Sequence, residues 1–93
     1  MTHTIIDKFG NIIGSVEVVE KDGLFSGELI GYNKSSDIIK LLKRYEGYVN
    51  DQVLTILDEI EDEINSYGLK VQEIESQIFN IQLFGDKLSY ELK

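Results

Sequence analysis

The sequence predicts an α+β fold, in which an antiparallel sheet from N- and C-terminal β-hairpins carries two consecutive helices packed on one face. Two short segments, Asp22-Gly23 and Gly85-Asp86, each separate runs of alternating apolar and polar residues, which is typical of β-hairpins. Between them, apolar residues recur every three or four positions from residue 38 to residue 67, as in helices. A chain of 93 residues has the length of one domain. We therefore expect a single domain over 1–93 with the order β-β-β-α-α-β-β-β.

The N-terminal strands are expected at residues 4–7, 12–20 and 24–32. A two-residue turn at Asp22-Gly23 pairs Lys21 with Leu24, and Val16 then lies opposite Leu29. Glycine on the apolar face of such a hairpin indicates close approach of a helix or curvature of the sheet. A phosphate-binding loop is disfavoured, because no glycine cluster opens a helix and no Gly-Lys-Ser/Thr motif follows. The glycines on this face are Gly14, Gly27 and Gly31.

The middle of the chain is expected to form two helices, at about 36–46 and 50–67. Ser35 or Ser36 can cap the start, and Gly68 can end the second helix. Gly47 and Asn50 interrupt the apolar stripe, and Asn50 is itself a good N-cap, so two helices are favoured over one unbroken helix. The stripe comprises Ile38, Leu42, Tyr45, Val49, Val53, Ile56, Ile60, Ile64 and Tyr67.

Two C-terminal strands are predicted by alternating apolar and polar residues on either side of Gly85-Asp86. A tight turn pairs Phe84 with Lys87 and places Phe79 opposite Leu92, so that six apolar side chains share one face. Residues 69–74 are expected to form a further strand, with a turn or bulge near 75–77. The six apolar residues are Phe79, Ile81, Leu83, Leu88, Tyr90 and Leu92, and they should meet Val53, Leu57, Ile60 and Ile64 of the second helix.

The composition argues against most catalytic and metal chemistry. The chain has no cysteine and one histidine, which excludes disulfides, thiolate zinc sites and cysteine nucleophiles. We expect His3 to be an exposed strand residue, and no serine has a histidine to activate it. The sequence therefore predicts a protein that is not an enzyme and has no cofactor and no metal. No apolar run approaches the roughly 20 residues of a membrane span, and no signal peptide precedes the first strand, so we expect a cytoplasmic protein without membrane contact.

Charge is distributed unevenly along the chain. Residues 1–45 hold six acidic and six basic side chains, whereas residues 46–93 hold eleven acidic and three basic ones and carry the whole net charge of −8. On the second helix, Asp58, Glu59 and Asp62 lie opposite the apolar stripe and Glu63 lies on its flank. The pairs Asp58/Asp62 and Glu59/Glu63 have i,i+4 spacing, where like charges destabilise a helix by about 0.2–0.5 kcal/mol per pair. Folding alone would favour lysines at these positions.

Three interpretations of this acidic helix stay open. It is a solvated face that confers solubility, an interaction surface for a basic partner, or a divalent cation site on Asp58/Asp62 or Glu59/Glu63. The first two are favoured over the third, because the segment lacks the glycine and the spacing of an EF-hand loop. Direct binding to DNA or RNA is not expected, because phosphate neutralisation needs a basic surface.

Among functions, we favour a small non-enzymatic interaction module whose acidic helix binds a basic protein partner, as an inhibitor, an immunity-type protein or a nucleic-acid mimic would. Tyr48 lies off the helical stripe and is a candidate exposed contact residue. The alternative is a structural homodimer or an accessory subunit of a larger complex, which would self-associate through a sheet edge or through its oppositely charged helices. The candidate partner-binding residues are Asp58, Glu59, Asp62, Glu63 and Tyr48.

One short segment resembles a known type of domain. Residues Asp7-Lys8-Phe9-Gly10-Asn11-Ile12-Ile13-Gly14 are similar to the opening hairpin of several small β-barrel domains, including PRC-type barrels. The segment covers under a tenth of the chain and consists mostly of turn residues. The helical middle departs from an all-β barrel, so this resemblance implies nothing about activity or partners.

Overall fold

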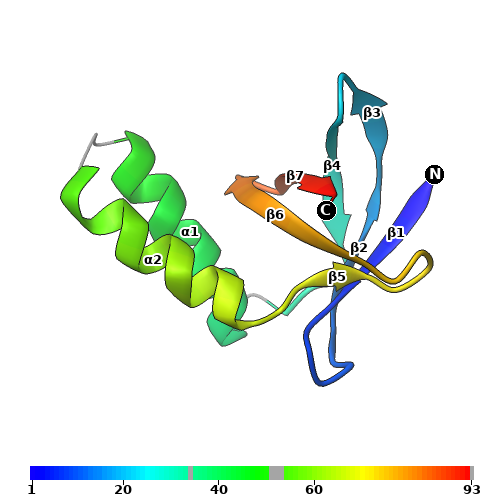
Figure 1. The fold of residues 1–93 in the computed structure, drawn as a ribbon, viewed down its shortest axis with the longest axis horizontal. Helices are drawn as coiled ribbons and strands as arrows, with labels where there is room; N and C mark the ends of the chain where they lie inside the picture. The colour runs from blue at the N-terminus through cyan, green and yellow to red at the C-terminus, as the bar shows by residue number, and fades with distance from the viewer. Residues whose placement is uncertain (34, 51–53, 93) are drawn as a thin grey trace.

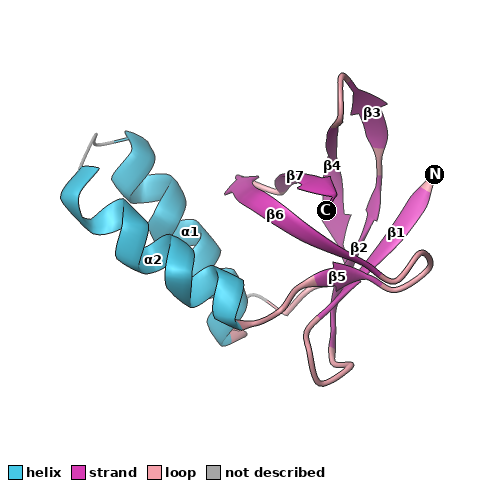
Figure 2. Ribbon diagram, viewed as in Figure 1, coloured by secondary structure: helices cyan, strands magenta, loops and turns pink. Residues whose placement is uncertain are grey.

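The computed structural model of the chain describes residues 1–33, 35–50 and 54–92. It combines an antiparallel sheet with two helices, as the sequence predicts, and the helices are inserted between β4 and β5 (Figure 2). The elements are β1 (Thr2–Ile6), β2 (Ile12–Glu17), β3 (Val19–Lys21), β4 (Leu24–Ile30), α1 (Asp37–Asn50), α2 (Leu54–Ser66), β5 (Lys70–Val71), β6 (Ser76–Phe84) and β7 (Lys87–Leu92) (Figure 1).

The sheet closes into a six-stranded antiparallel barrel. Around the ring the strands follow the order β1-β2-β4-β7-β6-β5, and β5 pairs with β1 again. β3 continues the direction of β2 and pairs with β4. The predicted sheet with helices on one face does not include this closure, because closure depends on pairs far apart in sequence, such as Ile5 with Val71. A closed ring satisfies the backbone groups that an open sheet would leave at its edges.

Glycines let the strands of the first hairpin approach closely. The predicted register is correct, with Val16 opposite Leu29. A Cβ added to Gly27 would lie 2.0 Å from the carbonyl oxygen of Glu17, and a Cβ added to Gly14 would lie 2.9 Å from Cδ1 of Leu29. Of the two predicted roles, Gly14 and Gly27 thus serve the curvature of the sheet, because the atoms they accommodate belong to neighbouring strands and not to a helix.

Two helices form as predicted, but the first is longer than expected. Ser36 caps α1, since its Oγ accepts a hydrogen bond from the amide of Ile39 at 3.3 Å. The predicted end at residue 46 is wrong, because α1 continues through Gly47 to Asn50. A glycine costs a helix only about 1 kcal/mol, which the packing of α1 against β6 and α2 offsets. Asn50 therefore ends α1 instead of capping α2, and the residues between the helices lie outside those described.

The end of α2 agrees with the sequence. α2 stops at Ser66, and Gly68 adopts the left-handed conformation, with φ of 60°, that ends many helices. The amide of Gly68 donates to the carbonyl of Asn65 at 3.1 Å. Neither helix, as far as the structure describes them, is long and apolar enough to cross a membrane.

A β-bulge around Asn80 breaks the predicted register of the C-terminal hairpin. Pairing next to the turn follows the prediction, but Phe79 lies opposite Glu91 instead of Leu92. Asn80 has φ of 52°, a left-handed conformation that asparagine tolerates better than most residues. Beyond the bulge Ile78 is buried and Phe79 is only half-buried. Ile78 therefore takes the place on the apolar face that was predicted for Phe79.

β5 is shorter than the predicted strand at 69–74. It comprises Lys70–Val71, and the turn to β6 covers residues 72–75, slightly before the predicted position. Glu75 closes this turn with φ of 50°, and Ile74 is half exposed at its tip. The β1–β5 side of the barrel therefore rests on two residue pairs, Ile5 with Val71 and Ile6 with Lys70.

One hydrophobic core joins the helices to the barrel. Ile60 and Ile64 of α2 are buried in it, as predicted, and Leu57 packs against it from a half-buried position. Val53, also predicted to face the sheet, lies outside the described residues. α1 contributes Ile38, Ile39, Leu41, Leu42 and Tyr45 to the same core.

His3 is buried, which contradicts the expectation of an exposed strand residue. Only 1% of its surface is accessible, and its Nδ1 lies 2.6 Å from the hydroxyl of Tyr90. Its imidazole ring also lies 5.5 Å, centroid to centroid, from the ring of Phe25. The error arises because a polar residue at the start of a chain carries no local sign of burial. Only the closed barrel brings β1 against side chains from β4 and β7.

Candidate functional site

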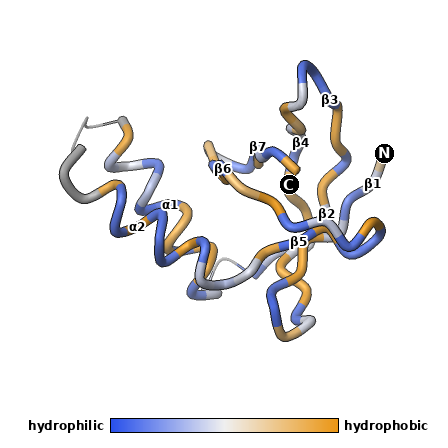
Figure 3. The backbone as a smooth tube through the Cα atoms, in the orientation of Figure 1, coloured by the Kyte–Doolittle hydropathy of each residue, from blue (hydrophilic) through white to orange (hydrophobic). Residues whose placement is uncertain are grey.

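The second helix presents the acidic surface that the sequence predicts. Ile60 and Ile64 are each 2% exposed and face the core, whereas Asp58, Glu59 and Asp62 are exposed to solvent. We call these three residues the acidic face. Figure 3 shows hydrophilic stretches along α2 interrupted by the apolar residues of the buried side. The structure thus confirms the amphipathic arrangement of these residues, while their role remains a hypothesis.

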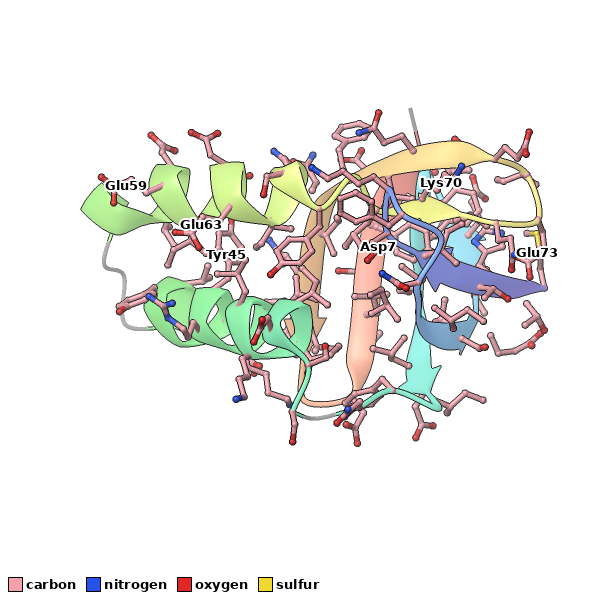
Figure 4. All side chains as sticks on the ribbon, turned by 90° about the horizontal axis from the view of Figure 1, so that it is seen from below. Asp7, Tyr45, Glu59, Glu63, Lys70 and Glu73 are labelled. Atoms are coloured by element: carbon pink, nitrogen blue, oxygen red, sulfur yellow. The ribbon has the colours of Figure 1, made fainter. Side chains whose placement is uncertain are left out.

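Glu63, the fourth predicted carboxylate, lies apart from the acidic face. It lines a groove of about 330 Å³ between the helices, together with Tyr67, which follows the end of α2. Figure 4 shows Glu63 and Tyr45 between the two helices, and Glu59 at the far end of α2. The opposite wall of this interhelical groove is formed by Asp37, Lys40, Leu41 and Arg44 of α1.

The charges of the acidic face are not compensated by ion pairs among the described residues. The one ion pair among the described residues lies elsewhere, on the barrel, where the amino group of Met1 contacts Glu17 at 2.7 Å. Basic side chains gather on α1, where Lys40, Lys43 and Arg44 are exposed. Lys43 donates a hydrogen bond to the carbonyl of Gly85 at 3.3 Å, which links α1 to the β6–β7 turn. The helical hairpin therefore exposes cations on one helix and carboxylates on the other.

Two tyrosines of α1 lie near this surface. Tyr45 is 8% exposed, and its pKa is raised by burial and, to a smaller extent, by the carboxylates of Glu61 and Asp58. Tyr48 is half-buried and packs against the core, so it is not the exposed residue that was predicted, and a contact role for it stays a prediction. Tyr48 lies off the apolar stripe, but α1 packs against both β6 and α2, so the stripe does not mark all of its covered surface.

A cation site receives no support from the geometry. No group of three or more histidine, cysteine, aspartate or glutamate side chains that could hold a metal occurs in the described ranges. Asp58/Asp62 and Glu59/Glu63 remain pairs of carboxylates on successive turns of one helix, and Glu63 faces the interhelical groove. Calcium binds six to eight oxygen ligands, many more than such a pair supplies.

A second concave surface, missed by the sequence analysis, adjoins the first. Its volume is about 220 Å³, and Tyr67 lines both hollows. Its other walls come from Ser66 and from the β1–β2 turn, where Phe9 is 79% exposed with the Lys8 amine 5.3 Å from its ring centroid. The backbone amide of Lys8 donates to the carbonyl of Tyr67 at 2.9 Å and fixes this turn against the end of α2. An aromatic residue in an otherwise polar turn is the one local sign of this surface.

Asp7 shapes the turn that carries Phe9. Its Oδ1 accepts the amides of Phe9 and Asn11, each at 2.9 Å, and its Oδ2 accepts the Asn11 side chain at 3.1 Å. Burial alone would raise the pKa of the Asp7 carboxyl, but these hydrogen bonds outweigh it and hold the pKa below its ordinary value. The carboxylate is therefore a structural anchor of the turn at neutral pH.

Comparisons with known proteins identify no relative of this chain. No protein-family model matches the sequence, and neither a curated protein nor a solved structure shows a significant match.

Proposed function

We propose that this protein is a small non-enzymatic interaction module whose acidic face on α2 binds a basic protein partner. The observation that carries the proposal is that Asp58, Glu59 and Asp62 are exposed together and unpaired in the described structure. A partner surface rich in lysine and arginine would supply the missing counter-charges. Such complementarity speeds association and selects partners.

The arrangement of these carboxylates favours binding over solubility alone. Asp58/Asp62 repel each other at i,i+4 spacing, and Asp62 lies in the second half of α2, towards the helix end where the dipole disfavours acids. Solubility requires a net charge but not this concentration of one sign, which residues 46–67 reach with seven acids and no base. A local arrangement that lowers stability without an evident structural gain is typical of a functional surface.

The position of the histidine supports a non-enzymatic role. His3 is the one histidine of the chain and is buried inside the barrel, whereas Ser35 and Ser66 are exposed to solvent. A general base must reach the proton that it abstracts within hydrogen-bond distance. Both hollows on the surface are open and are lined by lysine, arginine, acidic and aromatic side chains without an imidazole.

The proposal is tested with a charge-matched pair of variants. The first carries Asp58→Asn, Glu59→Gln and Asp62→Asn, and the second carries Asp22→Asn, Glu28→Gln and Glu75→Gln, which remove three exposed acids from the barrel. Both are used to capture proteins from the source lysate, and captured proteins are then purified and titrated against each variant. The proposal requires a basic protein that binds the wild type and the barrel variant and loses at least tenfold in affinity with the α2 variant. Equal affinity for both variants would reduce the acidic face to a solvated surface.

Glu63→Gln is examined separately because its side chain lies in the interhelical groove. If the partner inserts a basic side chain between the helices, this single change weakens binding more than Glu59→Gln does. Equal effects of the two changes would place the partner on the outer side of α2. Tyr48 is omitted from these variants, because its half-buried ring belongs to the core.

A second candidate function is self-association as a structural homodimer or as an accessory subunit. It is favoured by the exposed cations of α1, Lys40, Lys43 and Arg44, which could meet the acidic face of another copy. Sedimentation equilibrium at low and high salt measures this directly, because screened ion pairs weaken as salt rises. Lys40→Gln with Arg44→Gln should dissociate such a dimer, whereas Lys21→Gln with Lys87→Gln should leave it intact. A monomer at every salt concentration would eliminate the charge-paired homodimer.

A further inference from the structure

The hydrogen bond between His3 and Tyr90 crosses the interior of the barrel. In the ring order β1-β2-β4-β7-β6-β5, β1 and β7 lie three positions apart in either direction, so they are opposite strands. Nδ1 of His3 nevertheless lies 2.6 Å from the Tyr90 hydroxyl. Both residues are essentially inaccessible, at 1% and 0%. Phe25 of β4 packs beside them, with its ring nearly parallel to that of Tyr90 at 6.0 Å.

The hydrogen bond between His3 and Tyr90 is best satisfied when the imidazole is neutral. Nε2 of His3 has no hydrogen-bond partner among the described residues. If the Tyr90 hydroxyl donates to Nδ1, the phenol and Nδ1 are both satisfied, and the ring proton sits on Nε2. The Nε2–H group lacks an acceptor in either protonation state. A second proton on Nδ1 would also remove the acceptor of the Tyr90 hydroxyl, so protonation adds one more unpaired donor and a positive charge to the interior. Unpaired donors and a buried charge are each costly in an apolar interior.

The charges around His3 do not offset this cost. The amino group of Met1, just before β1, repels a protonated ring, although it is paired with Glu17 of β2. Glu73, in the β5–β6 turn, attracts a protonated ring, but its carboxylate is occupied by Thr4. Tyr90 of β7 is neutral, and its pKa is raised further by burial. Desolvation is the largest influence, and the pKa of His3 is lowered from its ordinary value.

β1 is held less firmly on its β5 side than on its β2 side. It pairs with β2 along its whole length but with β5 at Ile5 and Ile6. Beyond them Thr4 contacts the β5–β6 turn: the Glu73 carboxylate accepts the amide of Thr4 at 2.7 Å and its hydroxyl at 2.6 Å. The carbonyl of Thr4 accepts the amide of Gln72 at 2.9 Å. His3 is the neighbour of Thr4 in β1, so a displacement of the His3 ring acts directly on the contact between Thr4 and the β5–β6 turn.

We propose that His3 is a pH-sensitive latch of the barrel, whose protonation releases the β1–β5 side. Below the ordinary titration range of histidine, the cationic ring leaves the interior and turns to water. The cross-barrel hydrogen bond to Tyr90 is then lost, and β1 separates from β5 while it stays paired with β2. The latch is closed at neutral pH and opens under mild acid, before the carboxylates of Asp7 and Glu73 titrate.

NMR of the full chain tests the latch, because the single imidazole gives one unambiguous signal. We expect the folded imidazole to titrate below 6.5, the ordinary value for histidine. From about pH 7.5 to about pH 5.5, the unfolding equilibrium constant should rise by up to about tenfold, the limit for one proton whose uptake the fold opposes. Amide exchange, corrected for its intrinsic pH dependence, should accelerate in β1 more than in β6 and β7.

Three variants provide the controls. His3→Phe should remove the rise of the unfolding constant, and His3→Gln serves the same purpose if the phenylalanine variant does not fold. Tyr90→Phe should make the rise smaller, because the neutral imidazole then loses the donor that favours it. A folded-state titration at 6.5 or above, or equal acceleration of exchange in β1 and β7, would overturn the latch.

Discussion

Gly27 lies against the backbone of Glu17 so closely that a Cβ on Gly27 would come within 2.0 Å of the Glu17 carbonyl oxygen. Backbone atoms cannot move aside as a flexible side chain can. We therefore expect Gly27→Ala to lower the free energy of unfolding by about 3 kcal/mol, at the upper end of overpacking effects. Urea denaturation followed by circular dichroism measures this value. A loss of less than about 1 kcal/mol would show that the strands separate easily at this point of the barrel.

Gly47, unlike Gly27, has room for a side chain. It lies in α1, and no atom lies within 4 Å of the position that a Cβ would occupy. Gly47→Ala should raise the free energy of unfolding by about 0.5–1 kcal/mol, because alanine favours the helix and restricts the unfolded chain. The same urea titration compares the two variants directly. A loss of stability would mean that α1 needs the freedom of a glycine at this turn.

Asp7 should contribute to stability only while it is ionised. Asp7→Ala removes the acceptor of two backbone amides, and we expect it to lower the free energy of unfolding by about 1–2 kcal/mol at neutral pH. Because the folded pKa lies below the unfolded value, this contribution is complete above the unfolded pKa and disappears as pH falls through the folded one. The difference between wild type and variant should therefore shrink below about pH 4. Glu28→Ala, at an exposed position, is the control that should leave the acid limb of the stability curve unchanged.

The acidic face should weaken the fold that carries it. Replacing Asp58, Glu59 and Asp62 by their amides removes two like-charge i,i+4 repulsions, each of about 0.2–0.5 kcal/mol. We expect a total gain of about 0.5–1 kcal/mol at low ionic strength. Thermal unfolding at low and at high salt separates this effect from changes in packing, because only a charge effect is screened. A gain that persists unchanged at high salt would assign it to helix propensity.

The sequence predicts what local pattern and turn chemistry determine. Asp22-Gly23 and Gly85-Asp86 locate two hairpins, and the i,i+3/i+4 pattern locates Ile60 and Ile64 in the core. The acidic face follows from the same periodicity. Each of these features depends on residues fewer than about ten positions apart, where spacing alone is informative.

The remaining features depend on distant contacts or on small differences in energy. Barrel closure requires Ile5 to find Val71, and nothing near either residue signals the partner. The bulge at Asn80 shifts the register where strands in a closed ring must bend, so alternation alone assigns Phe79 to the wrong side. His3 is buried by that same closure. Gly47 lowers helix propensity by an amount that tertiary contacts easily offset, so the predicted helix end is displaced.

The insertion of the helical hairpin between β4 and β5 sets the order in which a nascent chain can fold. When residues 1–30 have left the ribosome, β1 to β4 are available, but β5, β6 and β7 are still to be synthesised. The local β1–β2 and β3–β4 hairpins and both helices can form early, because their contacts are short-range. The ring cannot close until Gln72 and Glu73 meet Thr4, nearly seventy residues back along the chain. Until then the inner surface is open to water, so interior packing is completed only after β6 and β7 have left the ribosome.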